Sequence, residues 1–117
     1  MGDRANVLVK DGQTDSGVYL YTHWEGTELP KILRDALAKK WRWQDVAYLT
    51  RIIFCEMVKG SEGEETGYGI SSFVTDGEGR TLTVDTATQT VGVGAKRRSF
   101  ADFAAMTDAQ CESVWEF

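Results

Sequence analysis

Apolar and polar positions alternate with two different periods along the chain, and the helical period is the clearest. Over residues 29–37 the apolar side chains follow the i, i+3, i+4, i+7, i+8 spacing of one helix face. Pro30 suits the first turn of such a helix, and Thr27 is placed to cap it. A second helix is predicted over 46–58, with Asp45 as its cap. Its apolar residues cover more than half of its circumference, so we expect it to be the central, buried helix.

A period of two, typical of β-strands, appears on both sides of these helices. Residues 7–9 and 18–24 are predicted to be two strands joined by a polar turn that contains glycine. Three more segments, at 68–74, 80–85 and 90–94, are separated by turn sequences such as T-D-G-E-G. We expect these three segments to form a three-stranded meander.

The C-terminal segment carries two capping-box patterns, Ser99 with Asp102 and Thr107 with Gln110. They predict a short turn of helix and then a last helix that ends near Trp115. The predicted order is therefore ββααβββα. We interpret residues 1–117 as one α+β domain with a mainly antiparallel sheet of about five strands, two central helices packed on one face and a C-terminal helix.

Strand parity assigns side chains to the two faces of this sheet. The face toward the helices should hold the aliphatic side chains of Val18, Leu20, Ile70, Val74, Leu82, Val84, Val91 and Val93. The opposite face then holds Tyr19, Tyr21, His23 and Phe73 among glycine, serine and threonine positions. Two interpretations stay open. The face is either a shallow aromatic groove that binds a partner, or an exposed sheet on which tyrosine and threonine occur because they favour strand formation.

Composition narrows the classes of function. The 117 residues include 18 acidic and 13 basic side chains, for a net charge of −5, which disfavours non-specific nucleic-acid binding. Cys55 lies inside an apolar helical pattern, so we expect it to be buried, and we expect no disulfide with Cys111. No apolar run has the length of a membrane span or a signal core, so we expect a cytoplasmic protein with no membrane association.

Candidate chemistry centres on the only histidine. His23 could act as a general base or acid if Asp85 or Glu25 oriented its ring. No nucleophile-elbow motif accompanies it, and one histidine with two distant cysteines does not supply zinc-ligand spacing. We therefore predict no metal and no cofactor, and an enzyme only as the alternative interpretation.

The W-R-W sequence at residues 41–43 lies between the two predicted helices. Trp41 and Arg42 are residue types that dominate interface hot spots, so they are candidate binding residues. A tryptophan between two helices also often fills the edge of the core.

Three runs, at residues 17–37, 48–58 and 65–72, resemble a family of small uncharacterised proteins found in bacteria and their phages. The strings Y-L-Y-T-H-W-E-G-T-E-L-P and T-G-Y-G-I-S carry the resemblance. It implies a phage or mobile-element context, and it assigns no site residue. Our leading hypothesis is a small soluble interaction module, an accessory protein that binds a host macromolecule, with a protein as the expected partner. The alternative is a small-ligand-binding domain or minor enzyme centred on His23.

Overall fold

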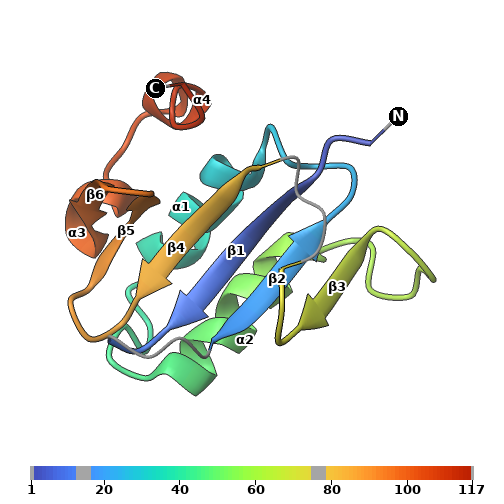
Figure 1. Ribbon diagram of the computed structural model, residues 1–117, viewed down its shortest axis with the longest axis horizontal. Helices are drawn as coiled ribbons and strands as arrows, with labels where there is room; N and C mark the ends of the chain where they lie inside the picture. The colour runs from blue at the N-terminus through green and yellow to red at the C-terminus, as the bar shows by residue number, and fades with distance from the viewer. Residues whose placement is uncertain (1, 13–16, 75–78, 117) are drawn as a thin grey trace.

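The computed structural model describes residues 2–12, 17–74 and 79–116, which form one sheet and a layer of helices (Figure 1). The six strands within these residues are β1 (Ala5–Lys10), β2 (Val18–Thr22), β3 (Tyr68–Ser71), β4 (Thr81–Asp85), β5 (Thr90–Val93) and β6 (Lys96–Ser99). The four helices are α1 (Leu29–Ala38), α2 (Val46–Met57), α3 (Phe100–Ala104) and α4 (Asp108–Glu112). The α+β class and the order of the first two strands and helices are as predicted. The turn sequences at 13–16 and 75–78 lie outside the described residues.

The sheet is mixed, in the order β3-β2-β1-β4-β5-β6. β1 pairs in parallel with β4, and the other neighbours pair antiparallel. The predicted meander of 68–74, 80–85 and 90–94 is therefore wrong, because β3 pairs with β2 at one edge while β4 pairs with β1. The alternation of apolar and polar residues identifies a strand, but it does not show which strand pairs with it. The almost fully buried β1 pairs with a strand on each side.

The sixth strand, β6, consists of the basic run K-R-R-S, which the sequence pattern indicated only as the end of the preceding strand. All four of its residues are exposed, as is usual for charged side chains on an edge strand. The sheet thus has one more strand than predicted.

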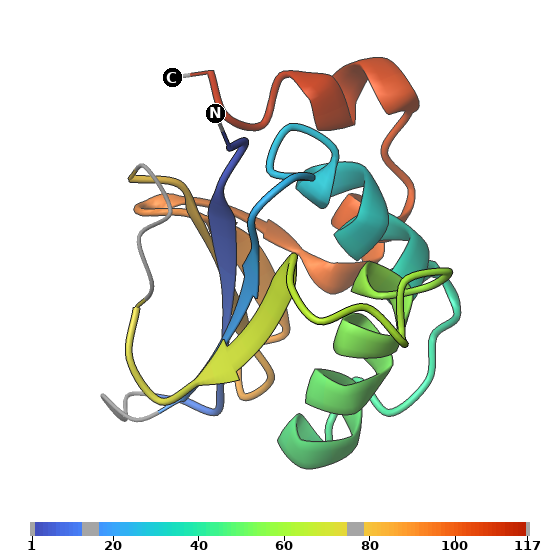
Figure 2. The ribbon, with the colours of Figure 1, turned by 90° about the vertical axis from the view of Figure 1, so that its right-hand side faces the viewer.

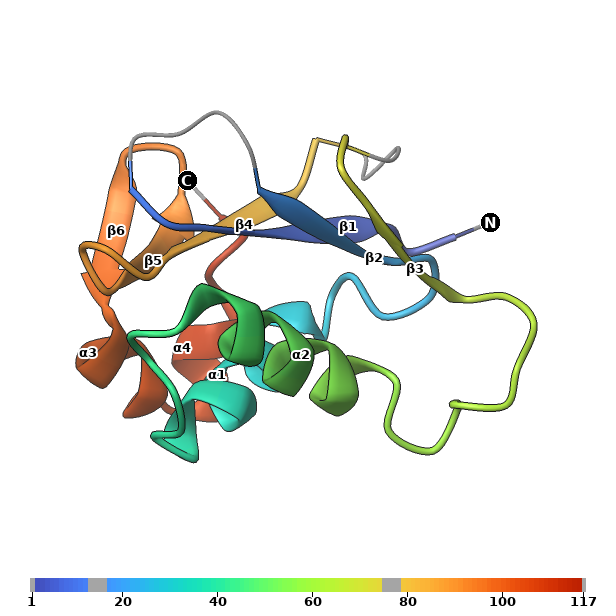
Figure 3. The same cartoon turned by 90° about the horizontal axis from the view of Figure 1, so that it is seen from below.

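All four helices lie on one face of the sheet (Figures 2 and 3). The shared core contains side chains from the sheet, from α1 and α2, and from α3: Val7, Val9, Leu20, Leu82, Val84, Val91, Leu29, Leu33, Leu37, Leu49, Ile53, Met57, Phe100 and Phe103. The predicted position on the helix-covered face is confirmed for Leu20, Leu82, Val84 and Val91, which are buried. Val18 and Val93 pack against this core.

Ile70 and Val74 do not join the core, contrary to the prediction. Ile70 lies opposite Leu20, on the helix side of the sheet, yet its side chain is 60% exposed. Its strand, β3, is an edge strand, and α2 packs against β1 and β2, nearer the middle of the sheet. Val74 lies beyond the end of β3 and is also exposed.

Local capping signals are largely confirmed. The Asp45 carboxylate accepts a hydrogen bond from the Tyr48 N–H at 3.1 Å, and Ser99 caps α3 in the same way. Thr107 and Gln110 form the expected capping box on α4. Thr27 does not cap α1: the residue before the helix is Glu28, and the Thr27 N–H donates to Asp3 Oδ2 at 2.9 Å.

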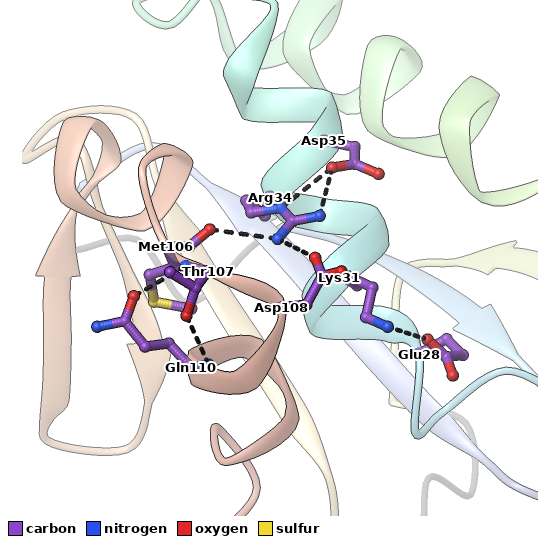
Figure 4. Close-up of polar contacts among 8 residues, drawn as sticks. All are labelled: Glu28, Lys31, Arg34, Asp35, Met106, Thr107, Asp108 and Gln110. Carbon is purple, nitrogen blue, oxygen red and sulfur yellow. Dashed lines mark hydrogen bonds and ion pairs between the residues drawn. The ribbon is translucent and has the colours of Figure 1, made fainter.

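The short C-terminal helix is tied to α1 by the Arg34 guanidinium (Figure 4). Arg34 donates to the Asp108 carboxylate at 2.6 Å, to the Met106 carbonyl at 3.2 Å and to Asp35 at 2.9 Å. The hydrogen bond from Arg34 holds the pKa of Asp108 below its usual value. Helix α4 itself ends at Glu112, earlier than predicted. In the described part of the chain, no helix combines the length and the apolar character needed to cross a membrane.

Candidate functional site

His23 lies just after β2, packed between two aromatic side chains. Its Nδ1 is 2.8 Å from the Tyr21 hydroxyl, and its ring meets the Trp24 ring edge-on with centroids 4.2 Å apart. The Glu25 carboxylate accepts a hydrogen bond from the Tyr68 hydroxyl. Burial and this bond raise the pKa of Tyr68 to about 12.

Asp85, the other candidate partner of His23, lies at the opposite end of the sheet. The register places Asp85 beside Lys10 at one end, whereas Thr22, just before His23, lies opposite Ala5 at the other. Its carboxylate accepts hydrogen bonds from the Gly12 N–H at 2.8 Å and the Ala87 N–H at 3.0 Å. Burial alone would raise the pKa of Asp85, but these N–H groups outweigh it and keep the pKa low. The structure therefore does not bring His23, Asp85 and Glu25 together.

The sheet face away from the helices carries the predicted tyrosines. Tyr19 lies opposite Leu8 and Ser71 in register, and Tyr21 lies opposite Asn6 and Gly69. Both tyrosines are half-buried. Phe73 is 69% exposed and lies beyond the end of β3, so it extends past the ladder that holds the tyrosines.

A second candidate surface lies on the outer side of α2, where the end of α1 and the α1–α2 connection meet it. We call it the α1–α2 groove; its volume is about 430 Å³. Its walls are Lys39, Trp41, Arg42, Tyr48, Arg51, Ile52, Cys55, Glu56 and Lys59. The groove thus contains the two residues, Trp41 and Arg42, that the sequence suggested as a binding anchor.

The backbone between the helices directs the two tryptophans differently. Lys40 and Arg42 adopt left-handed conformations, with φ of 60° and 57°, on either side of Trp41. Trp43 packs against the core, donating its indole N–H to the Leu37 carbonyl at 3.1 Å. Trp41 is 59% exposed in the groove. Of the two interpretations of W-R-W, core filling holds for Trp43, while Trp41 lies on the surface.

Helix α2 is amphipathic rather than buried all round, which corrects the prediction of a central helix. Leu49, Ile53 and Met57 pack into the core, but Tyr48 is 48% exposed and Cys55 is also exposed. The prediction that Cys55 is buried is therefore wrong. The physical reason is that α2 lies on the outside of a two-layer domain, so its second apolar stripe faces the groove.

Basic side chains surround this apolar surface. Lys39, Arg42, Arg51 and Lys59 line the groove with one carboxylate, Glu56, so positive charges exceed negative ones by three. Glu56 pairs with Lys39 at 3.3 Å and with Lys59 at 3.7 Å. The groove is thus a positive region on a chain whose net charge is −5.

The basic groups also lie over aromatic rings. The Lys39 ammonium is 5.3 Å from the centroid of the Trp41 ring, and the Arg42 guanidinium is 4.6 Å from that of Tyr48. These cation–π contacts hold the cations at the apolar surface.

Two further hollows differ in character. One of about 750 Å³ lies between the β5–β6 hairpin and helices α3 and α4, with largely polar walls. The other, of about 170 Å³, lies at the C-terminal end of α2. His23 lines none of these three hollows. Among the described residues, no group of histidine, cysteine and carboxylate side chains is arranged to hold a metal ion.

Comparison of the chain with protein-family models, curated proteins and solved structures found no match.

Proposed function

We propose that this chain is a small interaction module that binds a partner protein through the α1–α2 groove. The observation that supports it most is Trp41, a large apolar ring held in water beside Tyr48 and Arg42. Exposing such a ring costs free energy that a bound partner would recover. Tryptophan, tyrosine and arginine are also the residue types that contribute most to interface hot spots.

The surroundings of His23 support binding over catalysis. A general base needs a partner that orients it and room for a substrate. His23 has a tyrosine as its hydrogen-bond partner and a tryptophan ring in edge-on contact, and the two candidate carboxylates are engaged elsewhere. These contacts fit a structural role for the ring.

The biological setting is part of the same proposal. The resemblance of three runs to small phage and bacterial proteins supports an accessory role in which the partner is a host macromolecule. The free thiols of Cys55 and Cys111 support a reducing compartment such as the cytoplasm.

The test compares variants of exposed aromatic residues from different surfaces. Trp41→Ala should weaken a captured partner complex at least about tenfold, the loss typical of an interface aromatic. Phe73→Ala is the matched control, because it also removes an exposed ring, but from the end of β3. It should change the affinity less than about twofold. Circular dichroism should show both variants folded.

The reverse results identify the competing surfaces. Loss of the partner in Tyr21→Ala or Phe73→Ala, with Trp41→Ala unaffected, would move the binding surface to the open sheet face. Loss of a catalytic turnover in a folded His23→Ala variant, with Trp41→Ala fully active, would replace the proposal with the enzyme interpretation.

A further inference from the structure

We infer that the α1–α2 groove receives an acidic peptide segment that inserts an aliphatic or aromatic side chain between its carboxylates. This inference rests on the proposed function and specifies the chemistry of the partner. It is drawn from the distribution of apolar surface and charge around one side of α2.

The apolar floor of the groove is the reason for proposing an aliphatic or aromatic side chain in the peptide. Tyr48, Ile52 and Cys55 line one side, and Trp41 faces them from the α1–α2 connection. The volume of about 430 Å³ falls within the range of pockets that enclose a small molecule or a few side chains. An aliphatic or aromatic side chain placed there would cover the exposed part of Trp41.

The basic residues at the rim of the groove are the reason for proposing carboxylates in the peptide. The Arg42 and Arg51 guanidinium groups can each bind a carboxylate with two parallel hydrogen bonds, and the Lys39 and Lys59 ammonium groups add positive charge. Such pairs with a partner would form beside apolar surface, where the local dielectric constant is lower than in bulk water.

Glu56 acts as a counter-ion already present in the groove. Its largely buried carboxylate lies between Lys39 and Lys59. A partner carboxylate must share these two cations with Glu56, and it also meets the like charge of Glu56 at short range. Neutralising Glu56 should therefore strengthen the binding of an acidic segment.

Charge beyond the groove favours a peptide over a nucleic acid. The exposed residues Glu62, Glu64 and Glu65 follow Lys59 closely in the chain. A phosphate backbone running past Lys59 would meet this repulsion along with the net charge of −5. A peptide can place a few carboxylates at the rim and remain neutral elsewhere.

Cys55 provides a direct readout of occupancy. It is exposed in the groove, whereas Cys111 is buried and burial raises the pKa of its thiol. Alkylation by N-ethylmaleimide, followed by mass spectrometry, therefore reports on the groove at Cys55, with Cys111 as the internal control.

The probe is a short synthetic peptide in which glutamates flank leucine and phenylalanine. Its matched control carries lysine in place of each glutamate, and a single-stranded oligonucleotide is the third probe. The acidic peptide should slow alkylation of Cys55 in proportion to its concentration, while the lysine peptide and the oligonucleotide should not. Protection should decrease as salt is added.

Two charge variants test the rim, with affinity measured by fluorescence anisotropy of the labelled acidic peptide. Glu56→Gln should raise the affinity about three- to tenfold, and Arg51→Ala should lower it by a similar factor. A structural role for Glu56 alone would lower the melting temperature without raising the affinity. Because Arg51 is exposed, Arg51→Ala keeps the test informative if Glu56→Gln folds poorly.

The outcomes separate this inference from the proposed function. One outcome is that Trp41→Ala abolishes capture of the partner protein while Glu56→Gln and Arg51→Ala do not change its affinity. The proposed function then stands, and the inference of an acidic segment is wrong. Equal protection of Cys55 by the lysine peptide, or stronger protection by the oligonucleotide, would also overturn the inference. If none of the variants affects partner capture, the proposed function itself fails.

Discussion

Truncating the two adjacent isoleucines of α2 tests which side of this helix is structural. Ile53 is fully buried in the core, whereas Ile52, which is 8% exposed, lies outside the main core cluster and lines the α1–α2 groove. Replacing either isoleucine with alanine removes three carbon atoms, a loss of about 2.4 kcal/mol of transfer free energy at about 0.8 kcal/mol per carbon. At Ile53 the vacated space is enclosed, and about 60 Å³ of residual cavity would add about 1.4 kcal/mol.

We therefore expect Ile53→Ala to lower the free energy of unfolding by about 3 to 4 kcal/mol. Ile52→Ala should cost about 2 kcal/mol or less, because its space opens into the groove and leaves no enclosed cavity. Urea denaturation of both variants measures the difference as a shift in midpoint at unchanged slope. Equal costs, or a larger cost at Ile52, would show that the groove side of α2 is packed. In that case the surface proposed for binding would not be available.

Two further predictions concern the sheet and the C-terminal helix. A Cβ on Gly92 would lie 1.8 Å from the Lys96 carbonyl oxygen, so Gly92→Ala should lower the unfolding free energy by at least about 2 kcal/mol in urea denaturation. Gly69→Ala, whose Cβ would meet open space, should cost less than about 1 kcal/mol. Because Arg34 lowers the pKa of Asp108 in the folded state, the stability from this pair is present above the ordinary carboxyl pKa and disappears as the pH falls through the lowered value. The melting temperature of Asp108→Asn should thus be lower than that of the original chain at neutral pH and equal to it in strong acid; equal temperatures at every pH would contradict this linkage.

Short-range signals in the sequence predicted the helices well, because capping depends on residues three apart. Asp45, Ser99 and Thr107 each accept a hydrogen bond from the backbone N–H three residues later. The amphipathic period of α1 likewise lies within one segment. These features depend on residues within one segment, so the local sequence suffices to predict them.

Strand pairing could not be predicted in the same way, because it depends on contacts between distant segments. Nothing in the alternation of 68–71 or 81–85 shows that β3 pairs with β2 or that β4 runs parallel to β1. This topology also places Asp85 and His23 at opposite ends of the sheet. The candidate catalytic pair is thus separated because β2 and β4 run in opposite directions.

The groove was only partly visible in the sequence. The residue types of Trp41 and Arg42 suggested an anchor, but only the structure shows that Trp41 is exposed and Trp43 packs against the core. The second apolar stripe of α2, with Tyr48 and Cys55, was recognised as a stripe and expected to be buried. The exposure of Tyr48 and Cys55 depends on the layer structure of the domain, which places no further element over them, while Ile52 between them stays buried.

The acidic chain carries two groups of cations, one on β6 and one in the α1–α2 groove. The exposed basic residues of β6 form an edge strand, where charge discourages pairing with another sheet.

In the groove, Lys39 and Lys59 follow the C-terminal ends of α1 and α2, where a positive charge interacts favourably with the helix dipole. Arg42 and Arg51 have no such position: Arg42 lies in the α1–α2 connection with a left-handed backbone and Arg51 lies in the middle of α2, and both line the groove with Trp41. The Arg42 guanidinium also lies over the Tyr48 ring, so it stabilises the fold as well as placing a charge in the groove, whereas Arg51 is an exposed residue of the helix. Arg51 is therefore the residue at which a substitution should separate binding from stability most clearly.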